Sequence, residues 1–162
     1  MTTATKTAAR SKSNATAGDA IALLRADHVA VSALFAKYEK TSGASARKAI
    51  VADVCAALAV HAQIEEEIFY PAVTAATKDK KLVPEATVEH AGVKSLIEQL
   101  EGMEPDGAMY DAKVKVLSEY VKHHVKEEQE EMFPLARAAP LDIAELGARM
   151  LARKAELLAE RV

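Results

Sequence analysis

A short pattern of histidine, glutamate and proline occurs twice in this chain of 162 residues, and it restricts the fold more than any other feature. The two copies are His61-Ala-Gln-Ile-Glu65-Glu-Glu-Ile-Phe-Tyr-Pro71 and His124-Val-Lys-Glu-Glu128-Gln-Glu-Glu-Met-Phe-Pro134. A helix turns about 100° per residue, so each histidine shares a face with the glutamate four positions later. Apolar neighbours such as Ile64 and Ile68 lie around the first pair. Because burying such polar groups is costly unless they are paired or bind a metal, the repeated pattern needs a shared explanation.

Length and composition favour one helical domain. A chain of this length can bury roughly 70% of the surface that its unfolded form exposes, so it needs neither disulfides nor a second domain. Half of the residues are hydrophobic while only 4% are aromatic, which is typical of helical proteins. The formal net charge of −3 and a pI near 6.0 provide no general basis for binding nucleic acid or an anionic membrane.

The cysteine and hydropathy patterns indicate a soluble protein in a reducing compartment. Cys55 is the single cysteine, so no intrachain disulfide is expected. It lies roughly 120° from the face of His61, which favours a small core residue over the alternative of a redox thiol. No apolar run approaches the roughly 18 residues of a membrane span, and the first residues contain no signal-peptide core. We therefore expect a cytoplasmic protein.

The chain divides into three segments. Residues 1–17 are rich in Thr, Ala and Ser, and we expect a disordered tail. A solubilising leader is its favoured role, and contact with nucleic acid or a partner is the alternative. Residues 18–138 are expected to form the helical domain. Residues 139–162 are expected to contain an additional amphipathic helix, which covers an end of the bundle or pairs with another subunit.

Apolar residues recur at helical spacing in four long segments. The expected helices span residues 20–40, 46–70 with a further turn toward 77, 84–102 and 108–133, and a fifth helix spans 141–162. Asp19 can cap the first helix, Gly43 can stop it, and Pro71 is expected to kink or end the second. Short polar connections and the absence of strand patterns predict an all-α, up-down-up-down antiparallel four-helix bundle.

The two halves of the chain match beyond the His-x-x-x-Glu segments. An acid precedes a histidine in both the first and third helices, at Asp27-His28 and Glu89-His90. The second of these histidines lies 62 residues after the first, and the two His-x-x-x-Glu segments are 63 residues apart. The chain is therefore interpreted as a duplicated helical hairpin in which each helix contributes one inward histidine.

Four histidines and two glutamates can converge at one level inside such a bundle. Nitrogen together with carboxylate oxygen suits iron, manganese or zinc better than calcium or magnesium, and a carboxylate can bridge two metals roughly 3.5–4 Å apart. With two histidines per metal and two bridging glutamates, Glu65 and Glu128, each metal would have four protein ligands. Open positions would remain for solvent and for a small ligand such as O₂, NO or peroxide.

Two other metal-site patterns are absent from the sequence, namely the Glu-x-x-His of ferritin-like bundles and the His-Glu-x-x-His of zinc peptidases. Over about residues 19–136 the chain instead resembles hemerythrin-like proteins, in particular the HHE cation-binding domains. The resemblance implies a non-haem di-iron centre, that is, two iron ions with an oxo or hydroxo bridge. It implies as ligands His28, His61, Glu65, His90, His124 and Glu128, with the two glutamates bridging.

Two positions depart from the pattern of the oxygen-carrying hemerythrins. Those proteins have a further histidine four residues after the third-helix ligand, where this chain has Lys94. They also use an aspartate five residues after the last histidine, where this chain has Gln129 and offers Glu128 instead. The expected centre is one histidine short and more open, which favours sensing, iron handling or peroxide removal over O₂ carriage.

Five residues close to the ligand set have alternative interpretations. His123 is expected on the flank, because it points about 100° away from the neighbouring ligand, and a fifth histidine ligand is the alternative. Tyr120 is expected in the core, with a hydrogen bond to the site or iron ligation as the alternatives. Glu131 returns close to the ligand face. Asp27 and Glu89 are either hydrogen-bond partners of histidines on neighbouring helices or solvated acids.

Three functions follow from these observations. The leading hypothesis is a cytoplasmic di-iron protein that binds or senses O₂, NO or peroxide, or handles iron, under oxidative or nitrosative stress. The second is an enzyme that disproportionates hydrogen peroxide at the same centre. The third is a structural or partner-binding bundle without metal, whose C-terminal helix is the interaction surface and can form a homo-oligomer. Neither nucleic acid nor a membrane is an expected partner.

Overall fold

The computed structural model describes residues 18–161, and the tail expected at residues 1–17 lies outside them. Within this range the protein is all-helical and contains no strand, as expected. The principal helices are α1 (Ala20–Lys40), α2 (Ala44–Ile64), α4 (Leu82–Glu101), α5 (Ala108–Glu127) and α7 (Ile143–Glu160). After α2 come a π-helical turn, η2 (Glu65–Phe69), and the short helix α3 (Tyr70–Thr77). After α5 come a second π-helical turn, η3 (Glu128–Met132), and the short helix α6 (Phe133–Ala138).

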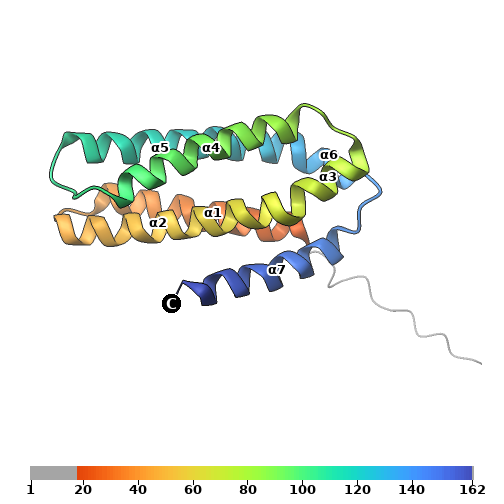
Figure 1. The fold of residues 1–162 in the computed structure, drawn as a ribbon, viewed down its shortest axis with the longest axis horizontal. Coiled ribbons are helices and arrows are strands. Elements are labelled where there is room, and N and C mark those ends of the chain that lie inside the picture. The colour runs from red at the N-terminus through yellow and green to blue at the C-terminus, as the bar shows by residue number, and fades with distance from the viewer. Residues whose placement is uncertain (1–17, 162) are drawn as a thin grey trace, which may run out of the picture.

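The long helices form two hairpins that lie side by side (Figure 1). Helix α1 packs against α2, α4 packs against α5, and the hairpins contact each other through α2 and α4. Successive helices are connected at alternating ends of the molecule (Figure 1). None of the helices described between residues 18 and 161 is long and apolar enough to cross a membrane.

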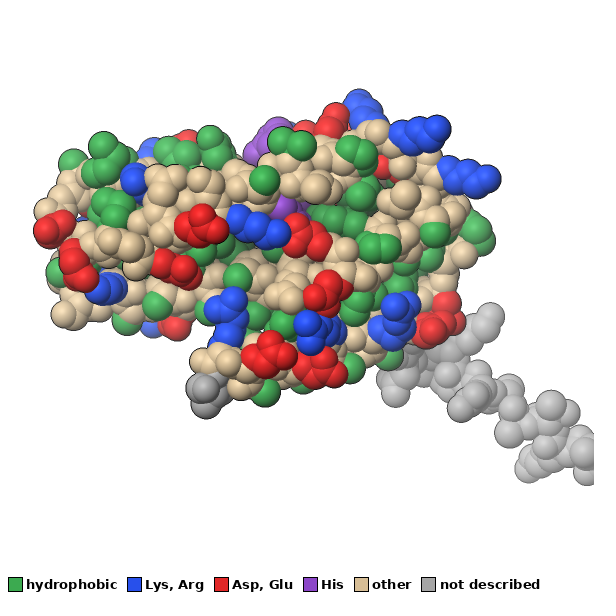
Figure 2. Space-filling view, in the orientation of Figure 1, with side chains coloured by type: hydrophobic (Ala, Val, Ile, Leu, Met, Phe, Trp, Pro, Cys, Tyr) green, Lys and Arg blue, Asp and Glu red, His purple; other side chains and the backbone are tan. Residues whose placement is uncertain are grey.

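The C-terminal helix α7 lies along the flank of the first hairpin and does not cover the end of the bundle (Figure 1). It contacts α1, α2 and η2, and it buries the side chains of Leu146, Met150 and Leu157. Charged side chains of both signs lie where α7 meets the hairpin (Figure 2). Arg153 forms one of these ion pairs with Glu67 of η2, with 2.8 Å between Nε and Oε2. The helix is therefore an integral part of this domain.

Local chemistry explains where α1 begins and how α2 starts. The Asp19 side chain accepts a hydrogen bond of 2.7 Å from the backbone N–H of Ala22, which confirms its role as the N-terminal cap. Helix α1 ends at Lys40, before Gly43. Gly43 has φ of 104° and directly precedes α2, so it forms the turn between the helices and does not stop the first one.

Pro71 and Pro134 each lie at the start of a short helix that extends the preceding one. Pro71 does not end the second helix, because α3 continues to Thr77, which confirms the further turn expected from the sequence. Both prolines instead follow a π-helical turn, in which the N–H groups of Tyr70 and Phe133 bond to the carbonyls of Glu65 and Glu128. Proline lacks an N–H and its ring crowds the carbonyl four residues back, so a wider turn before it relieves the conflict. Both π turns begin at the predicted bridging glutamates.

Two hydrophobic cores lie above and below a polar level. On α1, Leu24 belongs to one core and Val31 to the other, with His28 between them. Cys55 lies in the second core and is 1% exposed, which confirms that it is a core residue. Burial raises the pKa of its thiol to about 11, so the thiol is protonated at neutral pH. The polar level between the cores is the candidate functional site.

Candidate metal centre

Six buried side chains converge between the two cores. His28 comes from α1, His61 from the last turn of α2, His90 from α4 and His124 from the last turn of α5. The carboxylates of Glu65 and Glu128 are the first side chains of the two π turns, and they are 0% and 1% exposed. All six residues that the sequence singled out as ligands are therefore brought together in the structure.

The donor atoms fall into two groups of three. One group contains His28, His61 and Glu128, and within it one ligand atom from each residue lies within 4.8 Å of the others. The second group contains Glu65, His90 and His124 at the same spacing. In each group the two histidines belong to one hairpin and the glutamate to the other. Each group is therefore complete only when the hairpins pack together.

Both glutamates reach the histidines of both groups. Oε1 of Glu128 lies 3.2 Å from Nε2 of His28, and Oε2 lies 3.1 Å from Nε2 of His124. Oε1 of Glu65 lies 2.6 Å from Nε2 of His61 and 3.7 Å from Nε2 of His90. A carboxylate that extends between two groups of nitrogen donors is placed as a bridging ligand would be.

The donor set fits a metal because several of its atoms are buried without a hydrogen-bond partner. These atoms are Nε2 of His28 and of His61, Nδ1 of His90, both carboxylate oxygens of Glu65, and Oε1 of Glu128. Neighbouring atoms lie close to them, but without the geometry of a hydrogen bond. Buried polar atoms without partners destabilise a fold by about 1–3 kcal/mol each, so their convergence needs a compensating ligand. Imidazole nitrogen and carboxylate oxygen are suitable donors for iron, manganese or zinc.

Two acids orient the histidines that end α2 and α5. Asp27 Oδ2 lies 2.9 Å from Nδ1 of His61, and Glu89 Oε1 lies 2.9 Å from Nδ1 of His124. When Nδ1–H donates a hydrogen bond to a carboxylate, the other ring nitrogen, Nε2, keeps its lone pair free to bind a metal at the centre. The interpretation of both acids as partners of histidines on the neighbouring helix is confirmed. Asp27 Oδ1 in turn accepts from Lys154 of α7 at 2.5 Å.

The remaining two histidines also have polar neighbours outside the centre. The Gln129 amide lies 3.0 Å from Nδ1 of His28, and the Glu66 carboxylate lies 3.5 Å from Nδ1 of His90. Glu66 is held by Lys94, whose Nζ is 2.7 and 2.8 Å from its two oxygens. Lys94, at the position where the oxygen carriers have a histidine, therefore forms a surface ion pair outside the candidate centre.

The protonation of the metal-free centre reflects its crowded charges. Burial lowers the pKa of His61, but Glu65 and Asp27 together raise it to about 10. Burial also lowers the pKa of His124, but the nearby Glu128 carboxylate has the larger effect and raises that pKa to about 9. Burial and the like charge of Glu128 raise the pKa of Glu65 to about 8. At neutral pH these groups hold protons that a metal ion would replace.

Tyr70 is a site residue that the sequence reasoning missed. Its hydroxyl donates a hydrogen bond of 2.9 Å to Oε2 of Glu128. It also lies 3.2 and 3.3 Å from Nε2 of His90 and His124. The matching residue in the second repeat is Phe133, so aligning the two copies would have identified Tyr70 as a phenol at a core position.

The expectation for Tyr120 was wrong. Its side chain is 50% exposed, so it is neither a core residue nor close to the buried donors. The side chain of His123 is 65% exposed, which confirms its place on the flank. Glu131 is exposed as well and lies outside the centre. Tyr120 precedes His124 by four residues and lies about 40° to one side of it, whereas Glu128 follows by four residues and lies to the other side, which is the buried one.

A small apolar cavity adjoins the four histidines. It has a volume of about 30 Å³, and its apolar walls include Val31, Leu58, Val93 and Val121. A space of this size can hold one water molecule or a ligand of two or three atoms. Its walls combine imidazole groups with aliphatic side chains, so it suits a small and weakly polar ligand.

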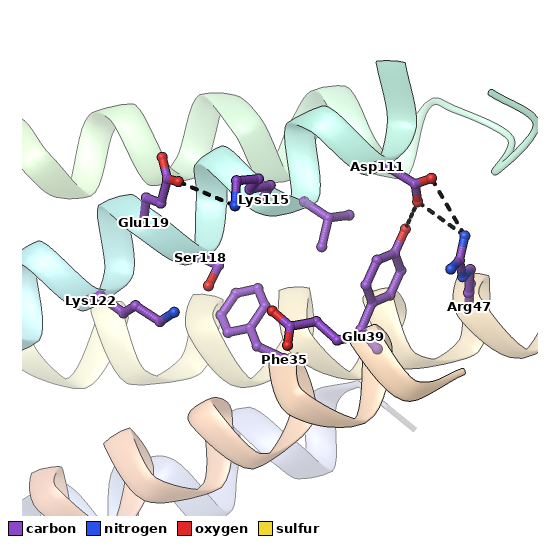
Figure 3. A pocket seen from close by; sticks show the side chains of 10 residues that line it. Phe35, Glu39, Arg47, Asp111, Lys115, Ser118, Glu119 and Lys122 are labelled. Carbon is purple, nitrogen blue, oxygen red and sulfur yellow. Dashed lines mark hydrogen bonds and ion pairs between the residues drawn. The ribbon is translucent and has the colours of Figure 1, made fainter. Parts of the chain in front are cut away.

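An open groove runs between α1 and α5 and reaches the same level. Figure 3 shows one part of it, about 340 Å³, with Phe35 and Ser118 at its base and the Arg47–Asp111 ion pair at one end. The adjoining part, about 370 Å³, extends to His28 and is also lined by Phe35 and Ser118. The groove therefore brings solvent close to one histidine of the centre.

These observations define an all-helical domain with a candidate cation site made of histidines and glutamates in its core. The family model described as the Hemerythrin HHE cation binding domain matches residues 19–136. The chain belongs to this family. The resemblance inferred from the histidines and glutamates is thereby confirmed.

A solved structure supports this assignment, and the chain is also similar to a curated protein of different description. The crystal structure of a hemerythrin HHE cation binding domain-containing protein from Mycobacterium kansasii has a TM-score of 0.77 and 25% sequence identity, with 88% of each chain covered. A DNA nickase from a Nostoc species is 26% identical over 115 residues, or 71% of this chain. The match covers 32% of that nickase, so this chain spans about a third of the curated relative.

Proposed function

We propose that this protein binds two iron ions in its core. The ligands would be the six buried residues, with His28, His61 and Glu128 around one ion and His90, His124 and Glu65 around the other. The observation that carries the proposal is that each glutamate reaches histidines of both groups. The donor set of imidazole and carboxylate favours iron over calcium or magnesium.

The surrounding residues have defined roles in this proposal. Asp27 and Glu89 accept the Nδ1–H of His61 and His124, and so they hold Nε2 toward the centre. Tyr70 lies close to His90, His124 and Glu128, which makes its hydroxyl a further oxygen donor for the second ion. Bound iron would supply electron transfer and open positions for a small ligand.

We infer that this ligand is O₂, NO or peroxide, bound for sensing or detoxification under oxidative or nitrosative stress. The cavity of about 30 Å³ beside the histidines accommodates such a molecule and excludes larger ones. Lys94 is bound to Glu66 on the surface, so the third-helix position that supplies a histidine in the oxygen carriers supplies no donor here. We propose a cytoplasmic location, which the single buried cysteine supports.

Peroxide disproportionation is a second candidate, favoured by Tyr70. In this reaction two molecules of hydrogen peroxide give two of water and one of O₂. In the metal-free centre, burial and the charges of Glu65 and Glu128 raise the pKa of Tyr70 above its usual range, so its hydroxyl keeps its proton at neutral pH. The phenol is therefore a hydrogen-bond donor held against the centre, positioned to stabilise charge on a bound peroxide.

Iron analysis of protein purified from iron-replete cells tests the main proposal. We expect about two iron ions per chain in the wild type, and a large loss in Glu65→Gln and Glu128→Gln. Glu131→Gln is the matched control, because its carboxylate is exposed and outside the centre. His123→Ala should likewise keep its iron.

The outcome also separates the alternatives. A protein with normal helicity by circular dichroism and almost no iron would contradict the proposal and favour a structural or partner-binding bundle. With iron present, absorption spectra before and after addition of peroxide, O₂ or NO identify the ligand. Evolution of O₂ from peroxide that persists after iron removal would exclude the enzymatic candidate.

A further inference from the structure

Asp27 and Glu89 lie at matching positions of the two hairpins. Each uses one carboxylate oxygen to bind a histidine of the centre, but the second oxygen has a different neighbour in each. Asp27 uses Oδ2 for His61, and its Oδ1 is bound to the ammonium group of Lys154. Glu89 uses Oε1 for His124, and its Oε2 lies 3.2 Å from Nε2 of His123. The first acid is therefore neutralised by a permanent cation, whereas the second faces an imidazole.

A second carboxylate adjoins that imidazole. Oε1 of Glu127 lies 3.3 Å from Nε2 of His123, and the two residues have the same i, i+4 spacing as the buried His-Glu pairs. One ligand atom each from Glu89, His123 and Glu127 lies within 4.8 Å of the others. In residues 18–161, neither carboxylate forms an ion pair with a lysine or arginine. The group therefore combines one imidazole with two carboxylates, and within the described part of the chain only the Glu89 carboxylate has a further partner, His124.

The group is accessible from solvent. The side chains of Glu89, His123 and Glu127 are 22%, 65% and 34% exposed. Glu89 and His123 line a surface depression between α4 and α5, together with Gly92 and Tyr120. An ion could therefore bind from solvent without opening the bundle, and water could complete its coordination.

We propose that Glu89, His123 and Glu127 form a third metal site, an exposed site for a divalent cation of the zinc class. One imidazole and two carboxylates, with a water molecule in the fourth position, are a donor set that zinc accepts in tetrahedral geometry. This cation would neutralise Oε2 of Glu89, just as the ammonium group of Lys154 neutralises Oδ1 of Asp27 in the other hairpin.

The shared carboxylate links this site to the buried centre. A cation on Oε2 of Glu89 withdraws charge from Oε1, which accepts the Nδ1–H of His124. His124 then becomes a weaker donor toward the centre, because the partner of Nδ1 tunes the basicity of Nε2. This link rests on the proposed role of His124 as an iron ligand, whereas the exposed site itself does not.

Zinc titration of the full-length protein tests the site. Calorimetry should show one more bound Zn²⁺ in the wild type than in His123→Ala, and Glu127→Gln should weaken that binding. Loss of outer partners alone lowers metal affinity about 10- to 100-fold, so loss of a ligand should lower it at least about tenfold. Glu119→Gln is the matched control, since it removes an exposed carboxylate of α5 outside the group. Equal Zn²⁺ stoichiometry and affinity in the wild type and His123→Ala would overturn the site.

The link is tested separately in iron-loaded protein. Zn²⁺ should shift the absorption of the iron centre in the wild type and leave that of His123→Ala unchanged. A wild-type spectrum that stays constant while Zn²⁺ binds would overturn the link and keep the site. If the protein takes up no iron, the difference in Zn²⁺ binding between wild type and His123→Ala still decides the exposed site, because the buried residues are the same in both proteins.

Discussion

The hydroxyl of Tyr70, from the first hairpin, donates a hydrogen bond of 2.9 Å to the carboxylate of Glu128, from the second. At the matching position of the second repeat, the ring of Phe133 is stacked on His28, with a centroid distance of 6.0 Å and an interplanar angle of 7°. At this position the two halves of the centre therefore differ by one hydroxyl group. Only the group of His90 and His124 has a phenol beside it, so the two proposed metal positions are not equivalent.

Tyr70→Phe should remove this difference between the halves. The metal-free variant should lose about 1.5–3 kcal/mol of unfolding free energy, because a buried carboxylate loses its hydrogen-bond donor. In the iron-loaded variant we expect an altered absorption spectrum, and about a 100-fold loss of any peroxide turnover because a hydrogen-bond donor to the bound peroxide is removed. Tyr120→Phe, which changes a half-exposed tyrosine, is the control for both measurements. Identical spectra in wild type and Tyr70→Phe would exclude the phenol as an iron ligand.

Asp27→Ala should weaken metal binding while leaving all six ligands in place. Asp27 holds Nδ1 of His61, and loss of such a partner typically costs about 10- to 100-fold in metal affinity. Lys154→Met should have a smaller effect in the same direction, because it frees Asp27 without removing it. Competition with a chelator measures the affinity, and Asp53→Ala on the exposed side of α2 is the control. Unchanged affinity in Asp27→Ala would show that His61 needs no such partner.

Metal affinity should rise with pH between about 6 and 8. His61, His124 and Glu65 have pKa values of about 10, 9 and 8 in the metal-free protein, all above neutral. A metal ion must displace their protons, and each proton released makes the affinity rise about tenfold per pH unit. Calorimetry with Mn²⁺ in two buffers of different ionisation enthalpy counts these protons. A binding constant independent of pH would contradict this account of the site.

Val93→Leu should obstruct the small cavity beside the histidines. The added methylene group enters a space of about 30 Å³, so binding of NO to the iron-loaded protein should weaken while the iron content stays the same. Some overpacking is expected, at a cost of about 1–3 kcal/mol in unfolding free energy. Val88→Leu is the control, because Val88 is 73% exposed. Unaltered NO affinity would show that the ligand enters elsewhere.

Gly147→Ala should loosen α7 from the bundle. A Cβ atom at this position would lie 2.2 Å from the carbonyl oxygen of Gly18 and 2.7 Å from the backbone nitrogen of Ala20, so the backbone would have to move. We expect a loss of about 1–3 kcal/mol, or a fall in Tm of roughly 2–4 °C for each kcal/mol. Gly107→Ala, where no atom lies within 4 Å of the new Cβ, is the control. Equal melting temperatures in the two variants would contradict the close packing of α7.

Much of the centre could be predicted because helices are periodic. A histidine and a glutamate four residues apart share a helix face regardless of what packs against it, so His61 with Glu65 and His124 with Glu128 were identifiable from spacing alone. The acids Asp27 and Glu89 were also identifiable, since each precedes an inward histidine on a helix that adjoins another. The further turn to Thr77 was predicted, whereas the matching turn to Ala138 and the two π turns were not, because the π turns relieve a steric conflict that depends on local geometry.

The choice between Tyr70 and Tyr120 was not available from the sequence. Both tyrosines are a few residues from a predicted ligand in the sequence. A difference of a few tens of degrees around the helix axis decides whether such a side chain faces the core or solvent. Only the packing of α4 against α5 shows that Tyr120 lies outside. The bond from Lys154 to Asp27 joins residues 127 positions apart, and it exists because α7 returns along the first hairpin.

By itself, the sequence determined the helical repeat, the six polar side chains that converge in the core, and the family, because these depend on residue type and on the constant rotation per residue of a helix. Only the tertiary structure decided that the glutamate of each hairpin completes the histidine pair of the other. That exchange depends on how two preformed hairpins pack, and on the π turns that carry Glu65 and Glu128. Packing and turn width are collective properties of the folded chain, and no spacing within one helix specifies them.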